Sequence, residues 1–171
     1  MVNRRTILKG LSSSVGILAL RGFEVSAAAP VYFTHGVASG DPLADRVILW
    51  SRVVPGDAEI DAVACDWQIA ATPDFKKPIN AGQVRALREH DFTVKVDATG
   101  LEPGRSYFYR FTAKGISSVI GQTRTLPIGQ VASYRIGVAS CSNYPQGYFH
   151  AYRHMAQSQL DLVLHLGDYI Y

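Results

Sequence analysis

The sequence is poor in charge, and what net charge it has lies at one end. Acidic and basic residues make up 18% of the 171 residues and hydrophobic residues 47%, which is typical of a globular chain and not of a disordered one. The whole formal net charge of +3 falls within the first 29 residues. The remainder is formally neutral, so it carries no electrostatic footprint for nucleic acid. The length suits one domain, or one and a fraction.

Cysteine is scarce as well: the chain has two, Cys65 and Cys141. In an oxidising compartment these two could form a disulfide. They fall in segments that we assign to different domains, however, and Cys141 stands where a metal ligand would be useful. We therefore favour two free thiols.

The first 29 residues have the organisation of an export signal. Arg4 and Arg5 precede a weakly apolar stretch at 11–20, and small residues at 26–29 supply a cleavage site. The apolar stretch is too short to span a membrane. The arginine pair resembles a twin-arginine (Tat) signal, so we expect export by the Tat machinery to a periplasmic or extracellular location. The alternative is an amphipathic N-terminal helix with a chance arginine pair.

Residues 30–127 follow the pattern of an all-β immunoglobulin- or fibronectin-like sandwich. Short stretches of strand character alternate with turns, and no convincing helix interrupts them. The predicted strands are 47–53, 64–70, 91–97, 106–111 and 121–125. In the third of these, Phe92, Val94 and Val96 alternate at period two and are expected to face the same way. We interpret residues 39–42 as an ordinary turn.

The spacing Leu101-x-Pro103-x-x-x-Tyr107 is typical of a tyrosine corner, in which the phenol bonds back to the backbone at a crossover between sheets. Trp67 is the candidate for the central core aromatic. Both could instead contact a ligand, but their positions inside periodic strands favour core roles.

Residues 133–171 have a different pattern, that of a β-α-β unit. A strand at 134–140 and a nearly continuous apolar strand at 160–166 enclose an amphipathic stripe from Tyr148 to Met155. A right-handed crossover would place the carboxyl ends of both strands on one edge. Cys141 and Asp168 follow those two ends, and Tyr171 lies on the same loop as Asp168.

Thiolate, carboxylate and phenolate ligands together favour a strongly Lewis-acidic metal such as iron. An aspartate can also bridge two metals. The alternative is that Asp168 belongs to a solvated turn, Cys141 is a small core residue and Tyr171 is a packing aromatic. His165, in its apolar strand, is more typical of a core histidine than of a ligand.

Five stretches of the sequence carry a family resemblance: 36–42, 47–50, 100–104 with 107–111, 139–142 and 165–171. Together they resemble the PhoD-type alkaline phosphatases, a family of exported metallophosphatases and phosphodiesterases. The resemblance implies an iron (Fe³⁺) and calcium site and a phosphate ester substrate. By position, Cys141 and Tyr171 would be iron ligands, and Asp168 would ligate iron and bridge to the second metal.

The chain departs from that family in length, since such enzymes continue for several hundred residues. It would therefore comprise the sandwich and a truncated α/β metallophosphoesterase domain, with the catalytic groups expected mostly beyond Tyr171. We expect the isolated chain to be inactive, and its last unit to be poorly ordered or sticky because of its open sheet edges. The alternatives are an exported fibronectin-like binding or structural module without catalysis, and a small electron carrier with Cys and Tyr ligands.

Overall fold

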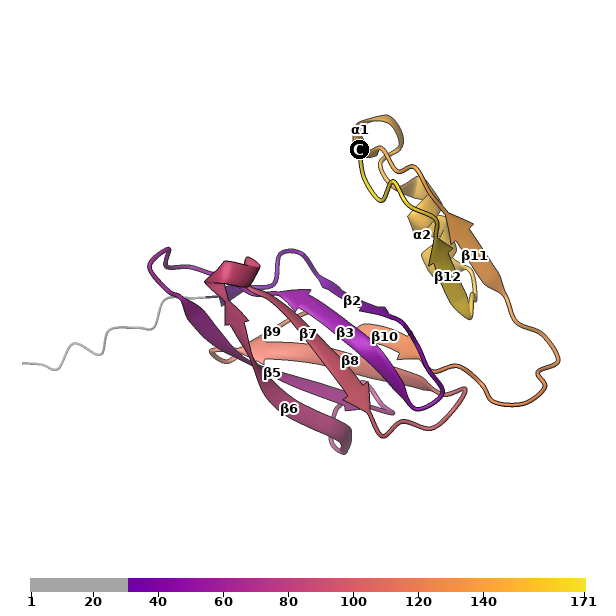
Figure 1. Cartoon of the computed structure of the whole chain (residues 1–171), viewed down its shortest axis with the longest axis horizontal. Coiled ribbons are helices and arrows are strands. Elements are labelled where there is room, and N and C mark those ends of the chain that lie inside the picture. Colours follow the sequence, from indigo (N-terminus) through magenta and orange to yellow (C-terminus); the bar gives the residue numbers. More distant parts are fainter. Residues whose placement is uncertain (1–30) are drawn as a thin grey trace, which may run out of the picture.

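The computed structural model describes residues 31–171, which form two parts of unequal size (Figure 1). The larger part is built of strands and ends near Thr125; the smaller one is a strand–helix–strand unit. The signal segment, with Arg4 and Arg5, lies outside the described residues. No helix within 31–171 is both long and apolar enough to cross a membrane.

Two antiparallel sheets make up the larger part. One has the order β2-β3-β7, formed by β2 (Val37–Gly40), β3 (Arg46–Arg52) and β7 (Thr93–Thr99). The other has the order β10-β8-β5-β6, formed by β10 (Gly121–Arg124), β8 (Ser106–Ala113), β5 (Ala62–Ala70) and β6 (Pro78–Leu87), with β9 (Ile116–Ser117) paired to β8. The short strands β1 (Val31–Tyr32) and β4 (Val54–Pro55) pair with each other, and a 3₁₀ turn spans Arg88–His90.

Alternating side chains from both sheets form one hydrophobic core. In β3, β7 and β8 every second residue is buried, as a strand with one face on a core requires. The core position predicted for Trp67 is confirmed, since the residue is only 7% exposed. Its indole lies against Gly82, where an added Cβ would come within 2.9 Å of the Trp67 Nε1.

The hydrogen bond of the predicted tyrosine corner is present. The Glu102 amide donates to Tyr107 Oη at 2.8 Å, and Tyr107 itself is buried. Buried Thr125 extends the corner, because its hydroxyl donates to the Glu102 carbonyl at 2.6 Å and accepts from the Arg105 amide at 3.1 Å. The last strand of the sandwich is thereby fixed just before the chain leaves for the second part.

Three sequence-based expectations differ from the structure. Strand β6 was not predicted, because it is an edge strand whose mostly exposed residues lack alternating hydrophobicity. The predicted turn at 39–42 begins as the end of strand β2, and only Asp41 has a left-handed backbone. The strand predicted at 91–97 starts only at Thr93, because Asp91 and Phe92 have left-handed backbones; Phe92 is partly buried and packs against the same core as Val94 and Val96.

A buried thiol and a buried phenol should make the stability of the sandwich depend on alkaline pH. Burial, aided by the Asp66 carboxylate, raises the pKa of the Cys65 thiol from 9.0 to about 12, and burial raises the pKa of the Tyr109 phenol from 10.0 to about 12. In the unfolded chain both groups ionise at their ordinary values. The stabilisation from keeping them neutral is therefore complete below pH 9 and is lost as the pH rises towards 12.

We expect the urea midpoint of unfolding to fall steadily between pH 9 and pH 11, because only the unfolded chain ionises there. The change in midpoint for Cys65→Ala, which lacks the thiol, should be smaller. A midpoint that stays constant up to pH 11 would contradict the raised pKa values of Cys65 and Tyr109.

The smaller part has the strand–helix–strand order expected from the sequence, and its strands are parallel. Strand β11 (Ile136–Ala139) pairs with β12 (Leu162–His165), and α1 (Tyr144–Gly147) and α2 (His150–Gln157) lie between them in sequence. Helix α2 packs closely over Gly137, where a Cβ would lie 2.7 Å from both Met155 and Leu160. Tyr148, predicted as part of the helical stripe, instead caps α1 with a left-handed backbone.

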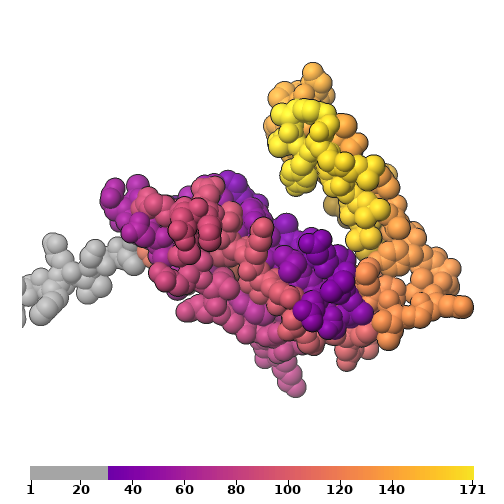
Figure 2. Space-filling model, viewed as in Figure 1, coloured from indigo at the N-terminus to yellow at the C-terminus, as the bar shows by residue number. Residues whose placement is uncertain are grey.

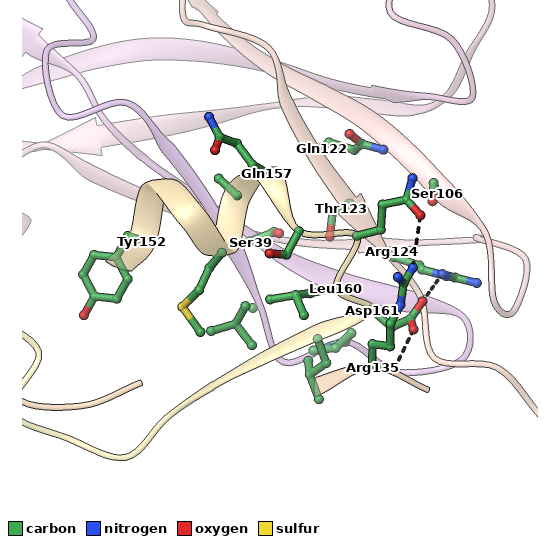
Figure 3. A pocket seen from close by; sticks show the side chains of 18 of the residues that line it. Ser39, Ser106, Gln122, Thr123, Arg124, Arg135, Tyr152, Gln157, Leu160 and Asp161 are labelled. Carbon is green, nitrogen blue, oxygen red and sulfur yellow. Dashed lines mark hydrogen bonds and ion pairs between the residues drawn. The ribbon is translucent and has the colours of Figure 1, made fainter. Parts of the chain in front are cut away.

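One ion pair connects the two parts across the cleft drawn in Figure 3. Arg124, the last residue of β10, contacts Asp161, whose other oxygen accepts from the Arg135 amide at 2.8 Å. Asp161 lies just before β12, so the contact holds the unit by the amino-terminal edge of its sheet. Helix α1 and the last residues lie at the far end, away from the sandwich, and Figure 2 shows the hollow between the two parts.

Candidate metal centre

The loops that follow the two parallel strands are bonded to each other through their backbones. Beyond the strands, the Leu166 amide donates to the Ala139 carbonyl at 2.9 Å and the Cys141 amide to the Gly167 carbonyl at 3.3 Å. Ser142 continues the series by donating to the Asp168 carbonyl at 3.1 Å and accepting from the Tyr171 amide at 2.9 Å. The parallel register thus continues past the sheet, and backbone hydrogen bonds join the two loops.

Both loops turn through left-handed backbone at the residues of interest. Cys141 has φ of 58° and Asp168 has φ of 48°, and Gly167 before it has φ of 113°. For a non-glycine residue this conformation costs about 1–2 kcal/mol. Such strain persists only where the surroundings enforce it, and here the bonds between the loops do so.

The three residues expected to form a site lie together at this edge. Cys141 Sγ is 3.6 Å from Asp168 Oδ2, and Tyr171 Oη donates to the same oxygen at 2.5 Å. All three side chains are exposed. A thiol, a carboxylate and a phenol therefore converge from two loops that are far apart in sequence.

The neighbouring groups in this cluster raise the pKa of the Tyr171 phenol. The hydrogen bond to the Asp168 carboxylate, and then one with Cys141, raise the pKa of Tyr171 from 10.0 to about 12. The bond favours the neutral phenol because ionisation would place a second negative charge beside the carboxylate. A cation bound at Asp168 would reverse that preference and favour the phenolate.

The donor set suits a strongly Lewis-acidic cation. Within residues 31–171 no group of three His, Cys, Asp or Glu side chains is placed to hold a metal, and the phenol of Tyr171 is the third donor beside Cys141 and Asp168. Anionic sulfur and oxygen donors of this kind fit ferric iron. The loop also holds Asn143, whose Oδ1 is buried without a hydrogen-bond partner among the described side chains.

His165 has a defined place that the sequence did not indicate. Its Nε2 lies 2.8 Å from Tyr152 Oη, and the Gly167 amide donates to its Nδ1 at 3.3 Å. It is only half-buried, so it is not the core histidine that its apolar strand favours. The only hint in the sequence was that a histidine stands three residues before Asp168, and hydrophobic periodicity does not say what such a histidine contacts.

Both cysteines are free in the structure: Cys65 is buried in the sandwich, and Cys141 is exposed at the candidate site. This agrees with the preference for two thiols over a disulfide.

Comparisons with known proteins give a consistent result for both parts. Residues 19–127 match the PhoD-like phosphatase N-terminal domain, and residues 136–171 match PhoD-like phosphatase. The chain is 40% identical to alkaline phosphatase D of Bacillus subtilis (strain 168) over 186 aligned positions, covering 99% of this chain and 32% of that protein. A solved structure of PhoD superimposes with a TM-score of 0.78 at 43% identity, covering 85% of this chain and 29% of that one. The chain thus spans about a third of the length of these relatives, and it belongs to the PhoD-like phosphatase family.

Proposed function

We propose that this chain supplies the sandwich and one side of the metal site of a PhoD-type alkaline phosphatase or phosphodiesterase acting on phosphate esters. The observation that carries the proposal is the convergence of Cys141, Asp168 and Tyr171 at the carboxyl edge of two parallel strands. Open α/β sheets bind their ligands at that edge. Family membership supplies the reaction class.

In this proposal iron would be held by the thiolate of Cys141, the carboxylate of Asp168 and the phenolate of Tyr171. The carboxylate of Asp168, which contacts both other side chains, would also bind the second cation, calcium. A metal pair of this kind supplies Lewis acidity towards a phosphoryl oxygen and a hydroxide nucleophile at neutral pH. The residues of this chain would hold the metal ions in place and balance their positive charge.

The proposed organisation is a signal at 1–29, a fibronectin-like domain at 30–127 and the start of the metallophosphatase domain at 133–171. Tat-dependent export to the periplasm or the extracellular space is part of the proposal and rests on Arg4 and Arg5. The Arg124–Asp161 ion pair would let the sandwich orient the metal-binding unit, because it holds the edge opposite the ligands.

The proposal is tested by adding ferric iron to the 171-residue chain and recording its visible spectrum. We expect a tyrosinate-to-iron absorption band that Tyr171→Phe abolishes, since Tyr171 is the assigned phenolate. Cys141→Ser should weaken iron binding while keeping a band. Phosphodiester turnover with iron and calcium should stay at background, because three ligands form only one side of a two-metal site.

Tyr169→Phe is the matched control, because Tyr169 lies on the same loop, is 73% exposed and packs on the His165 ring. It should leave the band unchanged. A band that survives Tyr171→Phe but disappears with Tyr169→Phe would overturn the ligand assignment. No iron binding by the parent chain would favour a module without catalysis.

A further inference from the structure

Three polar side chains form a hydrogen-bonded string behind the cysteine–aspartate–tyrosine cluster. Ser142 Oγ contacts Tyr152 Oη, which lies 2.8 Å from His165 Nε2. The three residues come from the loop after β11, from helix α2 and from the end of β12. We infer that Tyr152 and His165 are positioning residues that hold Ser142, and through it the three candidate ligands, in register. This inference rests on the proposed function.

The direction of the string follows from its last member. The Gly167 amide donates to His165 Nδ1 at 3.3 Å, so the neutral ring carries its proton on Nε2. That proton is donated to Tyr152 Oη, and the tyrosine proton is then directed to Ser142 Oγ. All the hydrogen bonds of the string therefore run towards the loop that carries Cys141.

Ser142 connects the hydrogen-bonded string to the candidate ligands. Its amide donates to the Asp168 carbonyl at 3.1 Å, and its carbonyl accepts from the Tyr171 amide at 2.9 Å. Cys141, its neighbour, has the left-handed backbone that needs external support. A displacement of Ser142 would change the distance of Cys141 from both Asp168 and Tyr171.

Ring packing fixes the middle of the string independently of its hydroxyl groups. The Tyr152 ring packs against Phe149, at 5.4 Å between ring centroids, and against His165, at 6.2 Å. His165 also packs against Tyr169 at 5.0 Å. Tyr152→Phe therefore keeps the packing and removes only the two hydrogen bonds, which separates positioning from folding.

We expect Tyr152→Phe in the full chain to bind ferric iron roughly tenfold or more weakly than the parent, with a shifted tyrosinate band, because supporting contacts tune metal ligands by such factors. Tyr148→Phe is the matched control: it removes a tyrosine hydroxyl that is exposed in the turn before α2. It should change neither the affinity nor the band.

Substitutions of His165 test the same string from its other end. His165→Gln can keep an N–H near the position of Nε2 and so can still donate to Tyr152, whereas His165→Leu cannot. The Gln variant should recover most of the iron affinity and the parental band, and the Leu variant should resemble Tyr152→Phe. Equal behaviour of the two variants would overturn the inference, and this comparison holds even if Tyr152→Phe fails to fold.

Amide hydrogen exchange in the metal-free chain separates this inference from the proposed function. Tyr152→Phe should speed exchange at the Ser142 and Tyr171 amides roughly three- to tenfold, while Tyr148→Phe should not. If the parent binds no iron, the proposed function fails, but accelerated exchange still supports the positioning role. Unchanged exchange in Tyr152→Phe would refute that role.

Discussion

Asp168→Asn is expected to abolish ferric iron binding and its visible band. Asp168 contacts both Cys141 and Tyr171, so the substitution removes a ligand and a group that aligns the other two. The loss of affinity should exceed the roughly 10- to 100-fold that loss of a supporting contact costs. Iron titration followed by visible absorbance measures it.

The same variant has a second readout without metal. The carboxylate raises the pKa of Tyr171 to about 12, so a neutral amide should let that pKa fall towards the ordinary 10.0. Phenolate absorbance at high pH reports the change. Asp74→Asn, the same substitution on an exposed turn of the sandwich, is the control. If Asp168→Asn still binds iron with parental affinity, the proposed site is wrong.

Trp67→Ala is expected to cost about 3–5 kcal/mol in the free energy of unfolding of the sandwich, as do comparable truncations of large core aromatics. Trp67 lies in the middle of β5, with Phe111 of β8 on one side and Gly82 of β6 on the other. The indole fills space that Gly82 leaves open, so a methyl group would leave a cavity. Since domains are stable by about 5–15 kcal/mol, the variant should be partly unfolded at moderate urea.

The chain provides a matched control in its other tryptophan. Trp50 is an outward-facing residue of β3 and only half-buried, so Trp50→Ala should cost about 1 kcal/mol or less. In the Trp67→Ala variant the remaining Trp50 reports unfolding by its fluorescence. Equal losses of stability for the two variants would show that Trp67 does not anchor the core.

The second part buries little of its apolar surface. No described residue after Thr125 is buried, and apolar side chains such as Val138, Leu166 and Ile170 are exposed. Two strands and a short helix cannot build a core, because they remove too little apolar surface from water. The expectation that this unit is poorly ordered or sticky in isolation remains a prediction.

Much of the sandwich could be predicted because its strands alternate. Trp67 and Tyr107 were placed correctly, since period-two patterning and a corner motif report burial locally. Strand β6 was missed because an exposed edge needs no apolar face. The start of β7 was predicted two residues too early, because Asp91 and Phe92 have left-handed backbones, which a hydrophobic pattern does not reveal.

By itself the sequence determined the order of the parts and the residue types at the candidate site. It also predicted that Cys141 and Asp168 would be neighbours, because parallel strands end at one edge. Only the tertiary structure decided that Tyr171 contacts the same Asp168 oxygen as Cys141 and that His165 contacts Tyr152. Those contacts depend on left-handed turns and on side chains from different loops that touch each other. Hydrophobic periodicity indicates which residues are buried, but not which side chains from separate loops come into contact.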